Sequence, residues 1–316
     1  MSYQLVNSLI TVLVMTFGLV TNIIVLMTVR KMGSMRSSFG IITKNQAVCN
    51  ILMCLLFLIF VGPLQLSDFK PSYNNSRFVG LASMMIFEAA AQLNFVNSLN
   101  RFFAVYTIFL YDRIFSNFKT YVMINMAYLI SISMCFVFYE LLGCYLYFDS
   151  NSWIFSYPES DHCTHLTWYC DFIFNIVLVV STLALNLLAA YKARKLHKRI
   201  TSLNQNMVSF QRQRDINFIR QSFFQGLSMC VALIFYHITA PLITNEILLF
   251  LDASLWAFML AFEGGIIILS NKEIFTAVKD KKTEIILDPF CILAFEVIDV
   301  VLRLLNEYFE FGQRNC

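Results

Sequence analysis

The chain has 316 residues, of which 58% are hydrophobic and only 14% are charged. Because a soluble domain carries about a quarter charged residues, this composition excludes an ordinary soluble protein and predicts membrane lipid as the main partner. The formal net charge of +3 is small, and the basic residues lie beside apolar segments rather than along one binding face, which excludes nucleic acid as an expected partner.

Apolar segments of about 20 residues are long enough to cross a bilayer as helices. We expect seven such spans, at 5–29, 39–63, 78–105, 121–147, 171–191, 221–245 and 253–270. They predict an all-α membrane protein, a seven-transmembrane helix bundle that forms one domain over residues 1–275. The first segment has no positive charge before it and is followed by Arg30 and Lys31. A cleavable signal peptide has the reverse pattern, so we interpret this segment as a span.

Lysine and arginine are distributed unequally between the two sides of the predicted membrane. One side has nearly all of them, in the connections at 30–44, 101–119 and 192–220 and after the last span. The other side has only Lys70 and Arg77. Since basic residues near spans stay in the cytoplasm, this pattern predicts a multi-pass protein of the plasma membrane with its N-terminus outside and its C-terminus in the cytoplasm.

The first span contains a lone asparagine, Asn22, four residues after Gly18 and three before Val25. This spacing places Gly18 and Asn22 on one helix face, where a neighbouring helix can approach closely. Asn22 must find hydrogen-bond partners because lipid offers none. The pattern resembles the first helix of rhodopsin-like receptors. Ordinary packing of small residues is the alternative interpretation.

The outer connections contain two kinds of modification site. Asn74 begins an Asn-x-Ser sequon and is a candidate for glycosylation if this connection reaches the lumen. The long connection expected at 148–170 contains Cys163 and Cys170, and Cys144 lies near the outer end of the fourth span. An oxidising exterior permits a disulfide, so Cys163 can pair with Cys170 or Cys144, or remain free. The cysteine spacing indicates no metal site.

The third span ends in the sequence Asn100-Arg101-Phe102. An arginine at this place resembles that of the Asp-Arg-Tyr motif of receptors, with both flanking residues replaced. In such receptors the arginine is held inward at rest and meets the G protein when the sixth helix swings out. The resemblance assigns Asn100 and Arg101 to G-protein coupling. The alternative is that Arg101 only anchors the span on the positive side of the membrane.

Ionisable side chains inside a span are costly in lipid and are therefore candidates for function. Glu88 and Gln92 share one face of the third span. His237 lies in the sixth span and Glu263 in the middle of the seventh. We expect a small polar ligand pocket, open to the outside, that is lined by Glu88, Gln92, Tyr236, His237 and Glu263. The alternative is that Glu88 and Glu263 are neutral or hydrogen-bonded between helices.

The segment after the last span forms a cytoplasmic tail, residues 276–316. Its apolar part, 285–311, contains too many charges for an eighth span, since each charge at mid-bilayer costs roughly 2.5–3.5 kcal/mol. These charges recur every three or four residues, which places them on one helix face. We expect a C-terminal amphipathic helix on the inner leaflet or on the receptor. An unstructured tail is the alternative.

Several motifs between residues 1 and 275 share a pattern with one known family. The longest motif spans residues 35–47 and begins Met35-Arg36-Ser37-Ser38-Phe39-Gly40-Ile41. The shorter motifs are Pro63-Leu64-Gln65-Leu66, Asn100-Arg101-Phe102, and Glu263-Gly264 followed by Asn271-Lys272-Glu273-Ile274. They resemble the nematode serpentine receptor class X chemoreceptors. The resemblance implies a rhodopsin-like fold, a chemosensory role and coupling to a heterotrimeric G protein on the cytoplasmic face.

The chain departs from the common receptor pattern at several places. It has no cysteine near the outer start of the third helix, and its seventh helix lacks the Asn-Pro-x-x-Tyr motif. Pro241 can kink the sixth helix, but aromatic and histidine residues replace the usual tryptophan before it.

The sequence therefore predicts a G-protein-coupled chemosensory receptor that binds a small-molecule or peptide ligand from the outer face. The resemblance suggests the membrane of sensory cilia as its location. We expect no cofactor, no metal and no enzyme activity, because HExxH and GxSG-type motifs are absent from the sequence. The alternative is a polytopic transporter or channel subunit, which would need internal repeats or a continuous polar path; neither is visible in the sequence.

Overall fold

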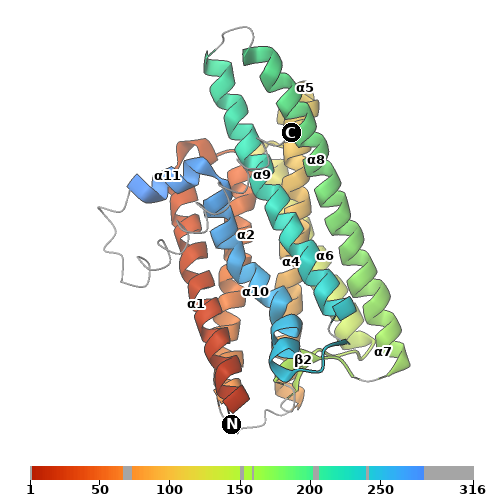
Figure 1. Ribbon diagram of the computed structural model, residues 1–316. Coiled ribbons are helices and arrows are strands. Elements are labelled where there is room, and N and C mark those ends of the chain that lie inside the picture. The colour runs from red at the N-terminus through yellow and green to blue at the C-terminus, as the bar shows by residue number, and fades with distance from the viewer. Residues whose placement is uncertain are drawn as a thin grey trace.

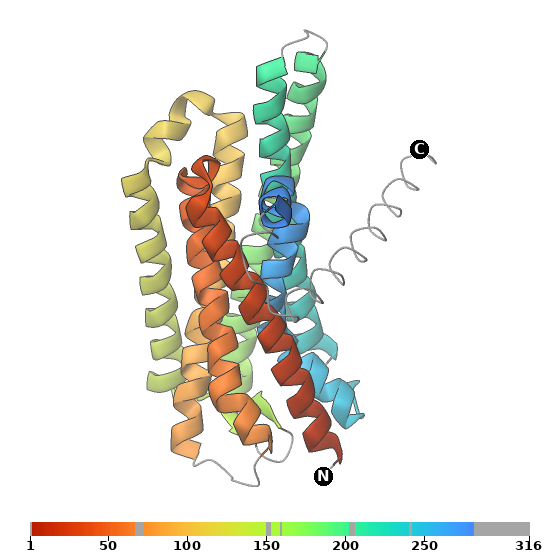
Figure 2. The same cartoon turned by 90° about the vertical axis from the view of Figure 1, so that its left-hand side faces the viewer.

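The computed structural model describes residues 2–66, 73–149, 153–158, 160–201, 206–239 and 242–280. Among these residues, seven helices are long and apolar enough to cross a membrane, which confirms the number predicted from the sequence. Their bounds are Tyr3–Lys31, Ser38–Gln65, Ser76–Tyr106, Asn117–Leu141, Asp161–Leu196, Ile216–Thr239 and Glu246–Ser270. They run roughly side by side as one bundle (Figures 1 and 2).

The elements follow one another as named helices, π-helical segments and two short strands. The main helices are α1 Ser2–Lys31, α2 Ser38–Leu56, α3 Gly62–Leu66, α4 Tyr73–Tyr106, α6 Asn117–Cys135, α7 Asp161–Leu166, α8 Phe174–Thr201, α9 Asn206–Ile234 and α10 Glu246–Ser270. Short helices connect or follow them: the 3-10 turn η1 Gly33–Met35, α5 Ile108–Ile114 and α11 Lys272–Asp280. The strands β1 Tyr147–Asp149 and β2 Ile154–Ser156 pair antiparallel, with Phe148 opposite Phe155.

The two ends of the bundle differ (Figure 1). One end, which we call the hairpin end, carries the N-terminus, α7 and the β1–β2 hairpin. At the other end, which we call the basic end, α8 and α9 extend beyond the other helices, and α5 and α11 lie beside the bundle. The fifth and sixth spans thus continue as helices into the connection expected at 192–220.

Several spans change to π-helical winding near the hairpin end. The segments are η2 Phe57–Val61, η3 Phe136–Leu141, η4 Thr167–Ile173 and η5 Phe235–Thr239, in the second, fourth, fifth and sixth spans. Such winding is rare and often occurs at functional sites, because it turns side chains out of the regular helical register. The concentration of these segments at one end singles out the hairpin end for closer inspection.

The bundle buries polar side chains and exposes apolar ones. In α1, for example, Asn7, Thr11 and Asn22 are buried, while Leu5 and Leu9 are exposed. This reverses the pattern of a soluble protein and fits a surface that meets lipid, where a polar group would find no hydrogen-bond partner. The buried polar groups therefore lie between the helices.

The close contact between α1 and α10 requires glycine. A Cβ atom at Gly18 would lie 2.4 Å from Cβ of Ala261, and one at Gly264 would lie 2.7 Å from the backbone nitrogen of Asn22. Both distances are shorter than carbon and nitrogen atoms tolerate. The first and seventh spans can therefore approach closely only because these positions have no side chain.

Several predicted span boundaries are wrong; the seventh span, for example, begins at Glu246 rather than 253. Two other errors affect the candidate site. The fourth span ends at Leu141 rather than 147, because the backbone turns at Gly143, whose φ of 76° suits glycine. The fifth span begins at Asp161 rather than 171, so most of the connection predicted at 148–170 consists of the hairpin and helical turns. Polar residues in α7 lower the local hydropathy and concealed this helix start. The Ser160 side chain caps it by accepting a hydrogen bond from the Cys163 nitrogen over 3.2 Å.

Some predictions fall at or beyond the limits of the described residues. The amphipathic helix expected at 285–311 and Pro241 lie outside them. The helix α11 crosses the domain boundary predicted at residue 275. Its buried residues Ile274 and Val278 belong to the same core cluster as Val25 and Ile267, so this short helix packs on α1 and α10.

Candidate functional site

A small cavity lies at the hairpin end. Its wall is mainly aromatic and apolar, with a few polar groups from the connection between the fourth and fifth spans and from the fifth and sixth spans. The lining residues are Met84, Phe87, Leu146, Tyr157, Asp171, Ala232, Leu233, Tyr236, His237 and Trp256. Leu146 immediately precedes β1 and Tyr157 immediately follows β2, so the base of the hairpin forms one wall. We call this space the hairpin-end cavity.

The polar part of the wall is centred on Asp171 in η4, which is only 4% exposed. The Tyr157 hydroxyl donates a hydrogen bond to Asp171 Oδ2 over 3.2 Å, and the Asn175 amide donates one to Oδ1 over 3.2 Å. His237 Nε2, on the sixth span, lies 3.9 Å from Oδ2. The fifth and sixth spans thus face each other through a carboxyl and an imidazole group.

Glu88 on α4 extends this group of polar side chains away from the cavity. The same Asn175 amide nitrogen that contacts Asp171 also donates a hydrogen bond to Glu88 Oε1 over 2.5 Å. Glu88 Oε2 and Asn175 Oδ1 are buried and have no hydrogen-bond partner among the described residues. We call Glu88, Tyr157, Asp171, Asn175 and His237 the Asp171 cluster. It contains more hydrogen-bond acceptors than donors.

Aromatic rings form the remainder of the wall. The Trp256 ring meets Phe87 edge to face, with centroids 5.7 Å apart. The Tyr157 ring stacks at 5.8 Å on Tyr139, which supports it from behind. His237 packs at 4.8 Å against Phe172. Such contacts hold the rings in fixed positions around the cavity.

The predicted ligand-binding residues do not lie together in one pocket. Tyr236 and His237 line the cavity, and Glu88 joins it indirectly through Asn175. Gln92 is buried one helical turn from Glu88, and neither Gln92 nor Glu263 is among the lining residues. The prediction grouped these residues because they are polar side chains inside spans. In the bundle they lie at different depths along their helices, so they do not share one cavity.

Asp171 is the ionisable lining residue that the sequence does not single out. It stands at the expected start of the fifth span, although an acidic residue followed by Asn175 at i+4 marks a polar helix face. With the true helix start at Asp161, Asp171 lies inside a span rather than at its mouth. The boundary error therefore concealed a buried carboxyl group.

Glu263 is instead the centre of a second polar group, in the middle of the bundle. Asn94 donates to its Oε1 over 3.2 Å, while Asn50 and Gln225 donate to its Oε2 over 3.0 and 3.3 Å. Asn50 also donates to Asn22 Oδ1 over 3.0 Å. These five residues, the Glu263 network, come from α1, α2, α4, α9 and α10. The interpretation of Glu263 as a hydrogen-bonded group between helices fits this geometry.

Asn22 has further partners within the first and seventh spans. Its amide nitrogen donates to the Gly18 oxygen over 2.8 Å and to the Ala261 oxygen over 3.2 Å. The close approach permitted by Gly18 therefore brings the Ala261 carbonyl of α10 within reach of Asn22. Packing and hydrogen bonding depend on each other at this contact.

At the basic end, Arg101 is buried to 4% exposure although it has a charged side chain. Its guanidinium carbon lies 4.1 Å from the ring centroid of Phe39 on α2 and 4.8 Å from that of Phe218 on α9. These two rings stack on each other with centroids 4.1 Å apart. We call Phe39, Arg101 and Phe218 the aromatic clamp. Arg101 also donates to Asn100 Oδ1 over 2.7 Å, so the residue in the place of the usual acid is a hydrogen-bond acceptor.

Two further contacts hold α9 near α10 at the basic end. Arg220 donates to the backbone oxygen of Ser270, with its Nε at 2.8 Å, which satisfies a carbonyl at the end of α10. Asn271 Nδ2 donates to Gln221 Oε1 over 3.2 Å. Together with Phe218, these residues attach the part of α9 near the basic end to its neighbours.

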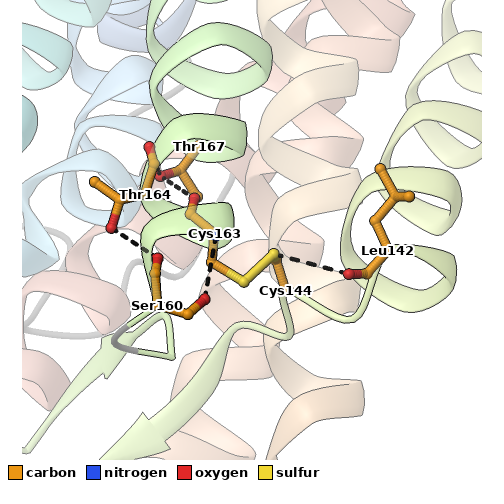
Figure 3. Close-up of a disulfide and its surroundings, with 6 residues drawn as sticks. All are labelled: Leu142, Cys144, Ser160, Cys163, Thr164 and Thr167. Atoms are coloured by element: carbon orange, nitrogen blue, oxygen red, sulfur yellow. Dashed lines mark hydrogen bonds between the residues drawn. A yellow bond between two sulfur atoms is a disulfide. The ribbon is translucent and has the colours of Figure 1, made fainter.

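A disulfide joins Cys144 to Cys163 at the hairpin end (Figure 3). It ties the segment after the fourth span to the first turns of α7, where Thr167 donates to the Cys163 oxygen over 2.9 Å. Among the described cysteines Cys170 is unpaired. Asn74 lies in the first turn of α4, and the direction of its side chain is outside the described structure.

Comparison with known proteins agrees with this architecture. The family described as "Serpentine type 7TM GPCR chemoreceptor Srx" matches residues 12–271, which is most of the chain. The chain is also 23% identical over 278 residues to "Serpentine receptor class X 45" of Caenorhabditis elegans, an alignment that covers 81% of this chain and 76% of that protein. With its seven spans and this family match, the chain belongs to the Srx family of serpentine seven-transmembrane chemoreceptors.

Proposed function

We propose that this protein is a G-protein-coupled chemosensory receptor of the plasma membrane, with the hairpin end outside the cell. A ligand enters the hairpin-end cavity, α9 swings outward at the basic end, and Arg101 then meets a heterotrimeric G protein. Two observations support the orientation. Most of the lysine and arginine residues lie at the basic end, in the connections at 30–44, 101–119 and 192–220, which favours the cytoplasm for this end. The Cys144–Cys163 disulfide lies at the opposite end, where an oxidising exterior would maintain it.

The observation that carries this proposal is the aromatic clamp. A buried guanidinium is costly unless its surroundings compensate for lost water. Phe39 and Phe218 offer ring faces to Arg101, and each such cation–π contact is worth about 0.5–2 kcal/mol. One of the two rings belongs to the sixth span. An outward movement of α9 would therefore remove Phe218 and uncover Arg101 in a single step.

The same span reaches from the clamp to the cavity. Phe218 lies in the inner half of α9, Ala232 and Leu233 line the cavity from its outer end, and Tyr236 and His237 follow in η5. A ligand that contacts Tyr236 or His237 better in one position of this span shifts the population toward that position. To move outward, α9 must break the contacts of Phe218, Arg220 and Gln221. These contacts therefore determine how much ligand-binding energy the movement requires.

The decisive experiment changes the clamp and measures nucleotide exchange. We expect Phe218→Ala to raise ligand-independent exchange on an added heterotrimeric G protein several-fold, because Arg101 loses one of its covering rings. Arg101→Ala should abolish exchange in the same background, because it removes the group that meets the G protein. Exchange is measured in membranes that contain equal amounts of each receptor.

The matched control is Phe118→Ala, since Phe118 is 77% exposed on α6 and makes no clamp contact. It should leave exchange unchanged. Exchange that stays at the wild-type level in Phe218→Ala, with normal amounts of folded receptor, would refute the release of Arg101 as the activating step.

A further inference from the structure

We propose that the hairpin-end cavity binds a small organic cation, a protonated amine whose ammonium group contacts the Asp171 carboxyl group. This inference rests on the proposed function, because it names the ligand class of the receptor's own cavity. Three properties carry it: the charge of the cavity wall, the excess of hydrogen-bond acceptors in the Asp171 cluster behind that wall, and the aromatic lining.

The Asp171 cluster contains more acidic groups than basic groups. It contains two carboxyl groups, Glu88 and Asp171, against one imidazole, His237. Among the described residues, neither lysine nor arginine lines the cavity. The distance of 3.9 Å between His237 Nε2 and Asp171 Oδ2 is longer than a hydrogen bond, so the imidazole does not saturate this oxygen. An anionic ligand would be repelled here, and a cation would be attracted.

The hydrogen-bond arrangement points to a ligand that donates. One amide nitrogen, Asn175 Nδ2, serves both carboxyl groups. Glu88 Oε2 and Asn175 Oδ1 remain buried without a partner among the described residues, with their side chains 3% and 0% exposed. A buried acceptor without a donor is unfavourable. Glu88 and Asn175 do not line the cavity, so an ammonium group meets this acceptor-rich group at the Asp171 carboxyl, to which it brings three donors and a positive charge.

The aromatic lining suits the same ligand. The rings of Phe87, Tyr157, Tyr236 and Trp256 all border the cavity that Asp171 enters. Aromatic faces attract a cation and also pack against the carbon skeleton that carries it. The cavity is small and closely bordered by these rings. The expected ligand is therefore a small amine with an apolar or aromatic body.

The test compares a cation with a neutral probe of nearly the same shape, 2-phenylethylamine and 2-phenylethanol. Binding to purified full-length receptor is measured by the concentration dependence of the thermal unfolding temperature, since a ligand of the folded state raises it. We expect the amine to bind at least tenfold more tightly than the alcohol, because a charge-assisted hydrogen bond exceeds a neutral one. A series from methylamine to tryptamine covers the range of sizes.

Variants then locate the ammonium group. Asp171→Asn should weaken amine binding about tenfold or more and leave the alcohol unaffected, and Glu88→Gln should weaken it less. The control is Asp252→Asn, because Asp252 is also a buried carboxyl near the hairpin end but contacts Thr239 and does not line the cavity. Should Asp171→Asn fail to fold, Glu88→Gln and the comparison of wild-type probes still decide the question.

Equal binding of the amine and the alcohol to the wild type, or no binding by any amine of the series, would overturn the proposal. So would unchanged amine binding in Asp171→Asn. The proposed function is tested independently of the ligand class, because the nucleotide exchange expected for Phe218→Ala needs no ligand. A receptor that drives exchange but binds no amine would refute the ligand class alone.

Discussion

At the scale of single residues, the buried Glu263 carboxyl group is satisfied by amides rather than by cations. Glu263 accepts hydrogen bonds from Asn50, Asn94 and Gln225, and each donor lies on a different helix. Both carboxyl oxygens are therefore used. Because lipid offers no replacement, these bonds help to set the mutual positions of four helices.

Glu263→Gln tests this role. Glutamine has one oxygen in place of two, so at least one of the three donors loses its acceptor. Hydrogen bonds between membrane helices are worth about 0.6 and at most about 1.7 kcal/mol each. We expect the free energy of unfolding to fall by about 1–2 kcal/mol, measured by denaturation of the purified receptor. Glu140→Gln serves as the control, because Glu140 makes one long contact of 3.9 Å with Arg77 and both side chains are partly exposed. An equal loss of unfolding free energy in Glu140→Gln would argue against a special role of Glu263.

At the scale of secondary-structure elements, glycine determines how closely two spans can pack. The contact of α1 with α10 leaves no room for a Cβ atom at Gly18, and it brings the Asn22 amide to the Ala261 oxygen at 3.2 Å. The first and seventh spans are distant in sequence, yet they form one of the most extensive contacts in the bundle. The seventh span is accordingly well buried along its length.

Gly18→Ala should separate these two helices. Overpacking of a tight interface costs about 1–3 kcal/mol, and loss of the Asn22 hydrogen bond adds to that cost. We therefore expect a lower unfolding temperature and a lower yield of folded receptor. Gly33→Ala is the matched control, because a Cβ atom at Gly33 meets nothing within 4 Å. If both variants unfold at the same temperature, close packing at Gly18 is not a determinant of stability.

At the scale of the whole molecule, the bundle has a cavity at one end and a covered arginine at the other, with the sixth span between them. The hairpin, the disulfide and the π-helical segments lie at the cavity end. The basic extensions of α8 and α9 lie at the other. This polarity is what a receptor that passes a signal across a membrane needs, provided that the hairpin end faces outward.

The orientation can be measured with epitope tags at the two termini. In intact cells we expect an antibody to reach a tag before Met1, and to reach one after Cys316 only when the cells are permeabilised. The physical reason is the excess of lysine and arginine at the basic end, which disfavours its translocation. Equal accessibility of both tags in intact cells would refute the predicted orientation and the receptor mechanism that depends on it.

The candidate site could be predicted from the sequence only in part. Tyr236 and His237 stood out as polar residues in a span and do line the cavity. Asp171 was missed because the polar start of the fifth span lowered its hydropathy and moved the apparent boundary. Arg101 was identified as a coupling residue, but its ring partners Phe39 and Phe218 lie on other helices. Nothing in the sequence around Arg101 names them.

The number of spans and the family follow from the amino-acid sequence alone, because a bilayer crossing depends on local composition and the family motifs are short linear patterns. Which buried polar groups meet depends instead on how the helices pack. Glu88 and Glu263 look alike in the sequence, yet one joins Asp171 near the cavity and the other joins three amides in the bundle centre. Depth and rotation of each helix decide those partners, and both are properties of the packed bundle rather than of any single segment.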